Sequence, residues 1–120
     1  MLIIAAVLIF LTGLAHSYLG ERYILMRLFR RDNLPKLFGS DQFTKATLRF
    51  AWHLTTVAWL GFAAILISIS DSANLSRTFV LNVIAAVAVL SGLLAAGFTK
   101  GKHLSWLVFF AIAVLSLYSI

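Results

Sequence analysis

Three histidines, one glutamate and one arginine are the residues of this 120-residue sequence that can do chemistry in an apolar setting. His16 lies five residues before Glu21, and His53 lies four residues after Arg49. The third histidine, His103, follows much later. Imidazole changes its charge near neutral pH, so a histidine beside a carboxylate can relay protons or gate a pore. This set predicts a pathway for an ion or a small solute.

The same histidines suit a second kind of site, in which they bind haem b or a divalent metal ion. Two imidazoles on facing helices can ligate haem iron axially, and three with a carboxylate can hold a metal ion. The ligands would then be His16, His53 and His103. The sequence has no cysteine and no HExxH or ExxH pattern, so the spacing of the histidines gives no further support for a metal or haem site.

Catalytic constellations are absent from the sequence. His16 and Ser17 are adjacent, so a helix points them in different directions and they cannot pair as base and nucleophile. There is no Gly-x-Ser-x-Gly elbow and no acidic pair. The sequence therefore favours a protein that is not an enzyme and predicts no catalytic residue.

Composition identifies the solvent of this chain. Hydrophobic residues make up 62% of it and charged residues 12%, whereas soluble domains have about 45–50% and about 25%. A short chain cannot bury so much apolar surface in a water-soluble core, so we expect lipid to surround it. The net charge of +6 comes from basic residues beside apolar stretches, where anionic headgroups attract them, and we expect no nucleic-acid partner.

Four apolar stretches without any charged residue have close to the ~20 residues that a helix needs to cross a bilayer. None alternates polar and apolar residues as the strands of a membrane barrel do. We therefore expect a single transmembrane domain over residues 1–120. Its fold should be all-α, an antiparallel bundle of four transmembrane helices over residues 2–19, 50–70, 78–99 and 104–120.

The basic residues predict the orientation of these spans. Segments 20–49 and 100–103 hold nine of the ten, and segment 71–77 holds only Arg77. Loops rich in Lys and Arg stay in the cytoplasm, so both termini should lie on the non-cytoplasmic side. His16 and His53 then lie roughly 6–8 Å inside the cytoplasmic charged edge, at 1.5 Å per residue. His103 lies at the same edge.

The cytoplasmic loop, residues 20–49, is long enough to have structure of its own. Residues 23–31 mix apolar and basic side chains, which suits a helical extension or an interfacial amphipathic helix. Asn33 and Pro35 predict the start of a short helix that ends at Phe38. Asp41 can cap the helix that leads into the second span.

Helical geometry groups the polar residues of the first two spans on one face each. Gly13, Ser17 and Gly20 form a face of small residues that permits close helix packing, and His16 lies in the same wedge. On the second span Arg49, His53 and Thr56 share a face flanked by Trp52. The simplest packing sets the face that carries His16 against this face. The expected pathway residues are His16, Ser17, Glu21, Arg49, His53 and Thr56.

A purely structural interpretation remains open for each of these residues. His16 can bond a backbone carbonyl or Thr56 across the helix pair, which contributes about 0.6 kcal/mol on average. His103 can be an interfacial residue, and Glu21 can pair with Arg22, Arg49 or Lys102 at the membrane edge. An accessory subunit without a transported ligand is the corresponding function.

The remaining expectations concern partners. Four short helices leave little room for a pore, so a pathway requires a homo-oligomer. The third span is almost wholly aliphatic and is the expected surface for contact with lipid or another subunit. Asn74-Leu75-Ser76 matches a glycosylation acceptor, a pattern that is common by chance.

Overall fold

Helices account for most of the chain in the computed structural model, which describes residues 1–71 and 75–120. No strand forms within those residues, and three helical segments are long and apolar enough to cross a membrane. The elements in chain order are α1 (Leu2–Leu19), the π-helix η1 (Gly20–Leu25), α2 (Met26–Leu28), α3 (Gln42–Asp71), α4 (Arg77–Thr99) and α5 (Ser105–Tyr118).

The first helix continues well beyond its expected end. α1, η1 and α2 form one uninterrupted run, Leu2–Leu28, so the apolar and basic residues after Leu19 extend the span helix and do not form a separate interfacial one. At the other end, α3 begins at Gln42. The segment 20–49 therefore contains the expected helical extension of the first helix and the start of α3 directly after Asp41, and only residues 29–41 connect the two helices.

α3 begins where the sequence predicted a cap. The Asp41 carbonyl accepts the Lys45 N–H at 3.0 Å, and the Ser40 hydroxyl accepts the Gln42 N–H at 3.3 Å. The Asp41 carboxylate lies 2.7 Å from the Lys45 ammonium. Two side chains therefore share the start of the helix, Ser40 by its hydroxyl and Asp41 by its charge.

Residues 37–40 form a tight turn where a short helix was expected over residues 35–38. The Leu37 N–H donates to the Ser40 carbonyl at 2.9 Å. Phe38 and Gly39 have φ values of 55° and 85°. Two successive left-handed residues are typical of a type I′ turn, and glycine adopts this conformation without steric cost. The helix prediction is wrong because Gly39 and Ser40 favour this turn over another helical turn.

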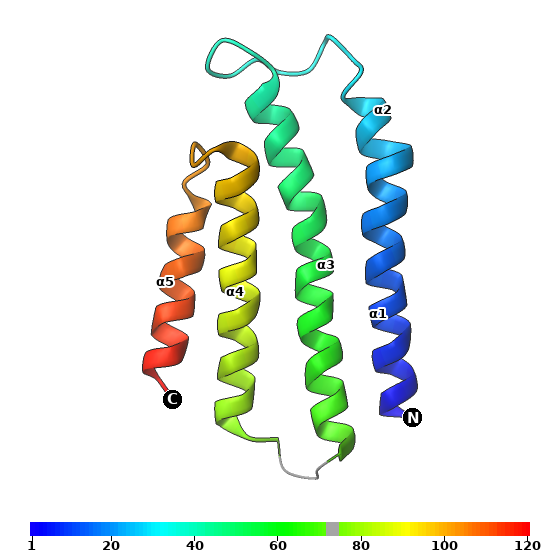
Figure 1. Cartoon of the computed structure of the whole chain (residues 1–120), viewed down its shortest axis with the longest axis vertical. Helices are drawn as coiled ribbons and strands as arrows, with labels where there is room; N and C mark the ends of the chain where they lie inside the picture. The colour runs from blue at the N-terminus through cyan, green and yellow to red at the C-terminus, as the bar shows by residue number, and fades with distance from the viewer. Residues whose placement is uncertain (72–74) are drawn as a thin grey trace.

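The long helices stand in a row in the order α1, α3, α4, α5, and each packs only against its neighbours in that row (Figure 1). The Cα atoms extend over 53 × 32 × 14 Å, and no long helix packs behind another one in the row. The fold is thus all-α with neighbouring helices in contact, but the helices form an open layer and not a closed bundle. Lipid does not drive apolar faces together as water does, so a layer can leave both faces uncovered.

α4 lies inside the row, between α3 and α5. Its buried residues are almost all small, namely Ala85, Ala88, Ser91, Gly92, Ala95 and Thr99. These small side chains allow two neighbours to approach α4, while Ile84, Leu90 and Leu93 remain exposed. Contact of this helix with lipid or another subunit stays a prediction. α5 has 14 residues, about 21 Å of helix, and is shorter than the expected span 104–120. The glycosylation pattern begins at Asn74, outside the described residues.

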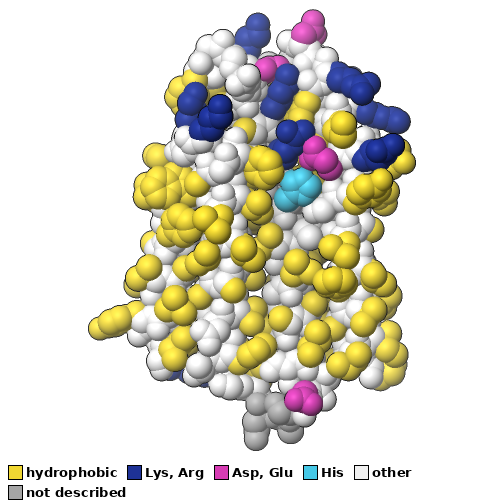
Figure 2. All heavy atoms as spheres, in the orientation of Figure 1, with side chains coloured by type: hydrophobic (Ala, Val, Ile, Leu, Met, Phe, Trp, Pro, Cys, Tyr) yellow, Lys and Arg dark blue, Asp and Glu magenta, His cyan; other side chains and the backbone are white. Residues whose placement is uncertain are grey.

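Charge is distributed unevenly along the layer. Lys and Arg side chains gather at the end that carries the 29–41 loop and the α4–α5 turn, and apolar side chains cover the visible face below them (Figure 2). His16 and His53 lie in the half of the layer nearer this basic end, because both are within a few turns of the 29–41 loop.

Candidate functional site

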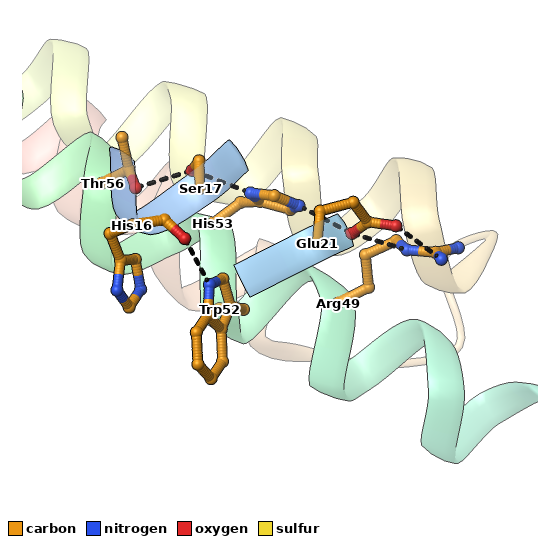
Figure 3. A network of polar contacts seen from close by, with 7 residues as sticks. All are labelled: His16, Ser17, Glu21, Arg49, Trp52, His53 and Thr56. Atoms are coloured by element: carbon orange, nitrogen blue, oxygen red, sulfur yellow. Dashed lines mark hydrogen bonds and ion pairs between the residues drawn. The ribbon is translucent and has the colours of Figure 1, made fainter. Parts of the chain in front are cut away.

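Polar side chains from two helices meet along one flank of the α1–α3 interface (Figure 3). α3 contributes Arg49, His53 and Thr56, which are spaced by four and three residues and so lie on one face. The first helix contributes Ser17 from α1 and Glu21 from η1, again four residues apart. Local helix geometry therefore aligns each set, and the packing of α1 against α3 brings the two sets together.

The outer part of this network is ionic. Arg49 Nη2 lies 2.8 Å from Glu21 Oε1, and Arg49 Nε donates to Glu21 Oε2 at 3.2 Å. His53 Nε2 lies 3.1 Å from the same Oε2 atom. The two-pronged contact of a guanidinium with a carboxylate is the strong form of this pair. Both side chains remain about one-third exposed, 34% and 30%, so the ion pair lies at the entrance of the interface.

The inner part of the network is a chain of neutral hydrogen bonds. His53 Nδ1 lies 2.9 Å from the Ser17 hydroxyl, which lies 2.7 Å from the Thr56 hydroxyl. Thr56 in turn donates to the Gly13 carbonyl at 3.0 Å, and its side chain is buried. Polar contacts therefore run without a gap from the charged end of the layer into its apolar interior.

This chain of hydrogen bonds is one hydrogen short when the imidazole is neutral and the carboxylate is ionised. Four contacts in series, from Glu21 to His53, Ser17, Thr56 and the Gly13 carbonyl, each need a hydrogen. A neutral imidazole and two hydroxyls supply three, because each has only one to donate. The fourth is an added proton, carried by the imidazole or the carboxyl group. All four contacts can therefore be hydrogen bonds at the same time only when the pair of His53 and Glu21 carries one added proton.

His16 lies on the opposite flank of the same interface. Its ring stacks on Trp52 with centroids 4.6 Å apart and planes 2° apart, and it also meets Trp59 at 5.1 Å. Trp52 Nε1 donates to the His16 backbone carbonyl at 3.0 Å. Within the small-residue face that carries His16, Ser17 is the residue that contacts His53, and the His16 ring lies on the other side of the interface. Adjacent residues on a helix point about 100° apart, so only one of His16 and Ser17 can face His53.

His103 has separate surroundings at the α4–α5 turn. Its Nδ1 lies 2.7 Å from the Ser105 hydroxyl, and its ring packs edge-on against Phe50 at 5.0 Å. Within the described ranges no three His, Cys, Asp or Glu residues are placed to hold a metal ion. Both ring nitrogens of His53 are engaged by Ser17 and Glu21, so a haem iron would have to displace one of these contacts.

Two features of the site escaped sequence reasoning. The first feature is the π-helix η1, which contains Glu21 and interrupts the α-helical pattern of the first helix. Short π-helical turns occur often at functional sites. No residue pattern predicts this π-helix. Gly20 is the second feature, because a Cβ atom there would lie 2.0 Å from Trp52 Nε1. The small-residue face identified Gly20 as a packing position, but the indole that fills its space could not be foreseen.

No family model, no curated protein and no solved structure matches this chain. Five of the six expected pathway residues form one connected network, Ser17, Glu21, Arg49, His53 and Thr56. His16 is the sixth and lies apart from it. The functional assignment therefore depends on the chemistry of this network.

Proposed function

We propose that the chain is a multi-pass integral membrane protein that translocates an ion or a small solute, with the α1–α3 network as its proton-binding site. The four apolar helices cross the bilayer, the basic end lies in the cytoplasm and both termini lie on the other side. Three helices of sufficient length and apolarity and the basic residues at one end support this placement. The network then lies in the cytoplasmic leaflet.

The proton count of the Glu21–His53–Ser17–Thr56 chain is the observation that carries the proposal. Ionisable residues inside a bilayer are costly and usually mark ion or proton pathways. Here the ionisable residues form a partly exposed ion pair, and hydrogen bonds connect this pair to the buried hydroxyl of Thr56. Protonation adds a hydrogen bond between the two helices and deprotonation removes one, so the proton state and the helix contact are coupled.

A homo-oligomer completes the proposed pathway. A row of helices in which no long helix packs behind another one encloses no lumen between its own helices. Two or more copies that face each other can enclose one, with lipid covering the outer faces. The inner end of the network at Thr56 then opens towards the space between copies when the helix contact loosens.

Proton flux in liposomes tests the proposal. The purified protein is reconstituted with an internal pH-sensitive dye, and wild type is compared with His53→Ala. We expect flux to fall by about 10²-fold, the lower end of the contribution of a positioned proton-transfer group. His103→Ala is the matched control, since this histidine lies outside the network, and should retain the wild-type rate.

Two results would contradict the proposal. Equal flux in wild type and His53→Ala would show that the network is not part of the pathway. Wild-type flux equal to that of empty liposomes would show that the protein does not translocate protons. A Soret band in the visible spectrum of the purified protein would instead support the haem-binding alternative.

A further inference from the structure

The flank of the α1–α3 interface that carries His16 contains an open groove of about 500 Å³. Its walls are aromatic and aliphatic, and it runs along the first helix from Thr12 to Ile24. The residues that line it are Thr12, Ala15, His16, Leu19, Gly20, Tyr23, Ile24, Trp52 and Trp59. None of them is acidic, and Glu21, the nearest acidic residue in sequence, is paired on the opposite flank.

The interior of the groove has one polar group whose hydrogen-bonding capacity is unused. His16 Nε2 is buried and has no hydrogen-bond partner in the described part of the chain. The ring is held between Trp52 and Trp59. Because neighbouring atoms cover this nitrogen, the ring contributes an apolar wall to the groove and offers no exposed hydrogen-bonding atom.

Two arginines stand at the basic end of the groove. The guanidinium carbons of Arg22 and Arg27 lie 6.0 and 5.7 Å from the centre of the Tyr23 ring, and Tyr23 itself lines the groove. Both arginines are exposed, and neither forms an ion pair with any residue the structure describes. Their positive charge is therefore free to attract an anion at this end.

We propose that this groove binds an anionic phospholipid, with an acyl chain along its apolar wall and the phosphate at Arg22 and Arg27. The twelve residue steps from Thr12 to Ile24 span about 18 Å of helix, close to the depth of one leaflet with its headgroup. Trp and Tyr side chains favour this interfacial depth.

The site rests on the proposed membrane location and cytoplasmic orientation, but not on translocation. Lipid covers any apolar surface in a bilayer, so selectivity for an anionic headgroup is the property that distinguishes a binding site from general solvation. Each basic residue near an anionic surface favours binding by about fivefold. The groove should therefore prefer an anionic phospholipid to a zwitterionic one of the same chain length.

Quenching of tryptophan fluorescence by brominated lipids measures this preference. A Trp106→Phe background leaves Trp52 and Trp59, which both line the groove, as the only tryptophans, and excitation at about 295 nm avoids the tyrosines. The protein is reconstituted into phosphatidylcholine vesicles that contain equal fractions of either brominated phosphatidylglycerol or brominated phosphatidylcholine. We expect stronger quenching by brominated phosphatidylglycerol, with the preference lost in Arg22→Gln/Arg27→Gln.

Lys100→Gln/Lys102→Gln is the matched control, because it removes the same charge at the same end of the layer, beside α4 and α5. It should keep the preference. Quenching by brominated phosphatidylcholine in each variant shows that the variant is inserted and folded around its tryptophans.

Three outcomes overturn the lipid site: equal quenching by the two lipids in wild type, equal loss of preference in both double variants, or a preference that survives Arg22→Gln/Arg27→Gln. Absence of quenching by either lipid overturns the membrane location as well. If the protein keeps the lipid preference but shows no proton flux, the lipid site is supported and only the proposed translocation is contradicted.

Discussion

Two helix interfaces of this layer are held together by different chemistry. Between α4 and α5 the buried residues are small, with Ala85, Ala88 and Ala113 in one apolar cluster and Gly92 against the ring of Phe110. The polar residues Ser91 and Ser116 are buried in the same two helices. Between α1 and α3 small residues are also present, but Ser17, Thr56 and the Glu21 ion pair add a continuous polar network.

The α4–α5 interface shows what packing alone requires. Small residues allow two helices to approach closely, and this is sufficient for association in lipid. The polar network between α1 and α3 therefore exceeds what the contact needs, and polar groups in a bilayer are costly unless they are paired. This difference is consistent with the role proposed above for the α1–α3 interface.

The largest effect should come from the tightest point of the α1–α3 interface. Gly20→Ala places a Cβ atom 2.0 Å from Trp52 Nε1, and the indole is held by its hydrogen bond to the His16 carbonyl. We expect destabilisation by about 2–3 kcal/mol, near the upper end for overpacking, measured by unfolding in detergent. Gly97→Ala is the control, since nothing lies within 4 Å of that position; equal losses in the two variants would contradict the close contact.

A smaller effect is expected at the corresponding point of the α4–α5 interface. Gly92→Ala brings a Cβ atom to 2.9 Å from the Phe110 ring edge. The ring can move by a few tenths of an ångström, so the cost should be about 1 kcal/mol, the lower end for overpacking. The same unfolding assay checks it. Proton flux per folded molecule should not change, and a loss of flux would show that this interface is also functional.

The smallest effect should follow from removing one hydroxyl of the network. Thr56→Val keeps the shape of the side chain but removes its bonds to Ser17 and the Gly13 carbonyl. We expect a loss of about 0.6 kcal/mol, the average for such bonds in membranes, together with reduced proton flux.

Thr47→Val on the same helix is the matched control. The Thr47 hydroxyl is buried and has no hydrogen-bond partner among the described residues, so its removal should leave stability unchanged or raise it. A larger loss in Thr47→Val than in Thr56→Val would refute the network as a stabilising contact.

The helix bounds expected from the sequence are accurate in some parts of the chain and not in others. The expected helix over residues 78–99 is within one residue of α4, because its charged and turn-forming flanks are abrupt. The expected helix over residues 35–38 is wrong because two left-handed residues form a turn there. The ends of α2 and α3 lie inside the expected loop because amphipathic and basic residues continue a helix as readily as they form a connection.

Within the candidate site, the sequence by itself determined which residues share a helix face and lie at one depth. Helical periodicity sets both properties, and it depends only on spacing. This was enough to group Ser17 with Gly13 and Gly20, and His53 with Thr56. It was not enough to separate Ser17 from His16, since the two are adjacent.

The sequence also determined that the chain is helical and apolar, because each such helix satisfies its own backbone hydrogen bonds. Only the tertiary structure decided that the helices form an open row and that His53 pairs with Glu21 and Ser17 while His16 stacks on Trp52. These outcomes depend on how far α1 is rotated about its axis against α3. That rotation is set by contacts such as the indole over Gly20, which join residues more than thirty positions apart and leave no local trace in the sequence.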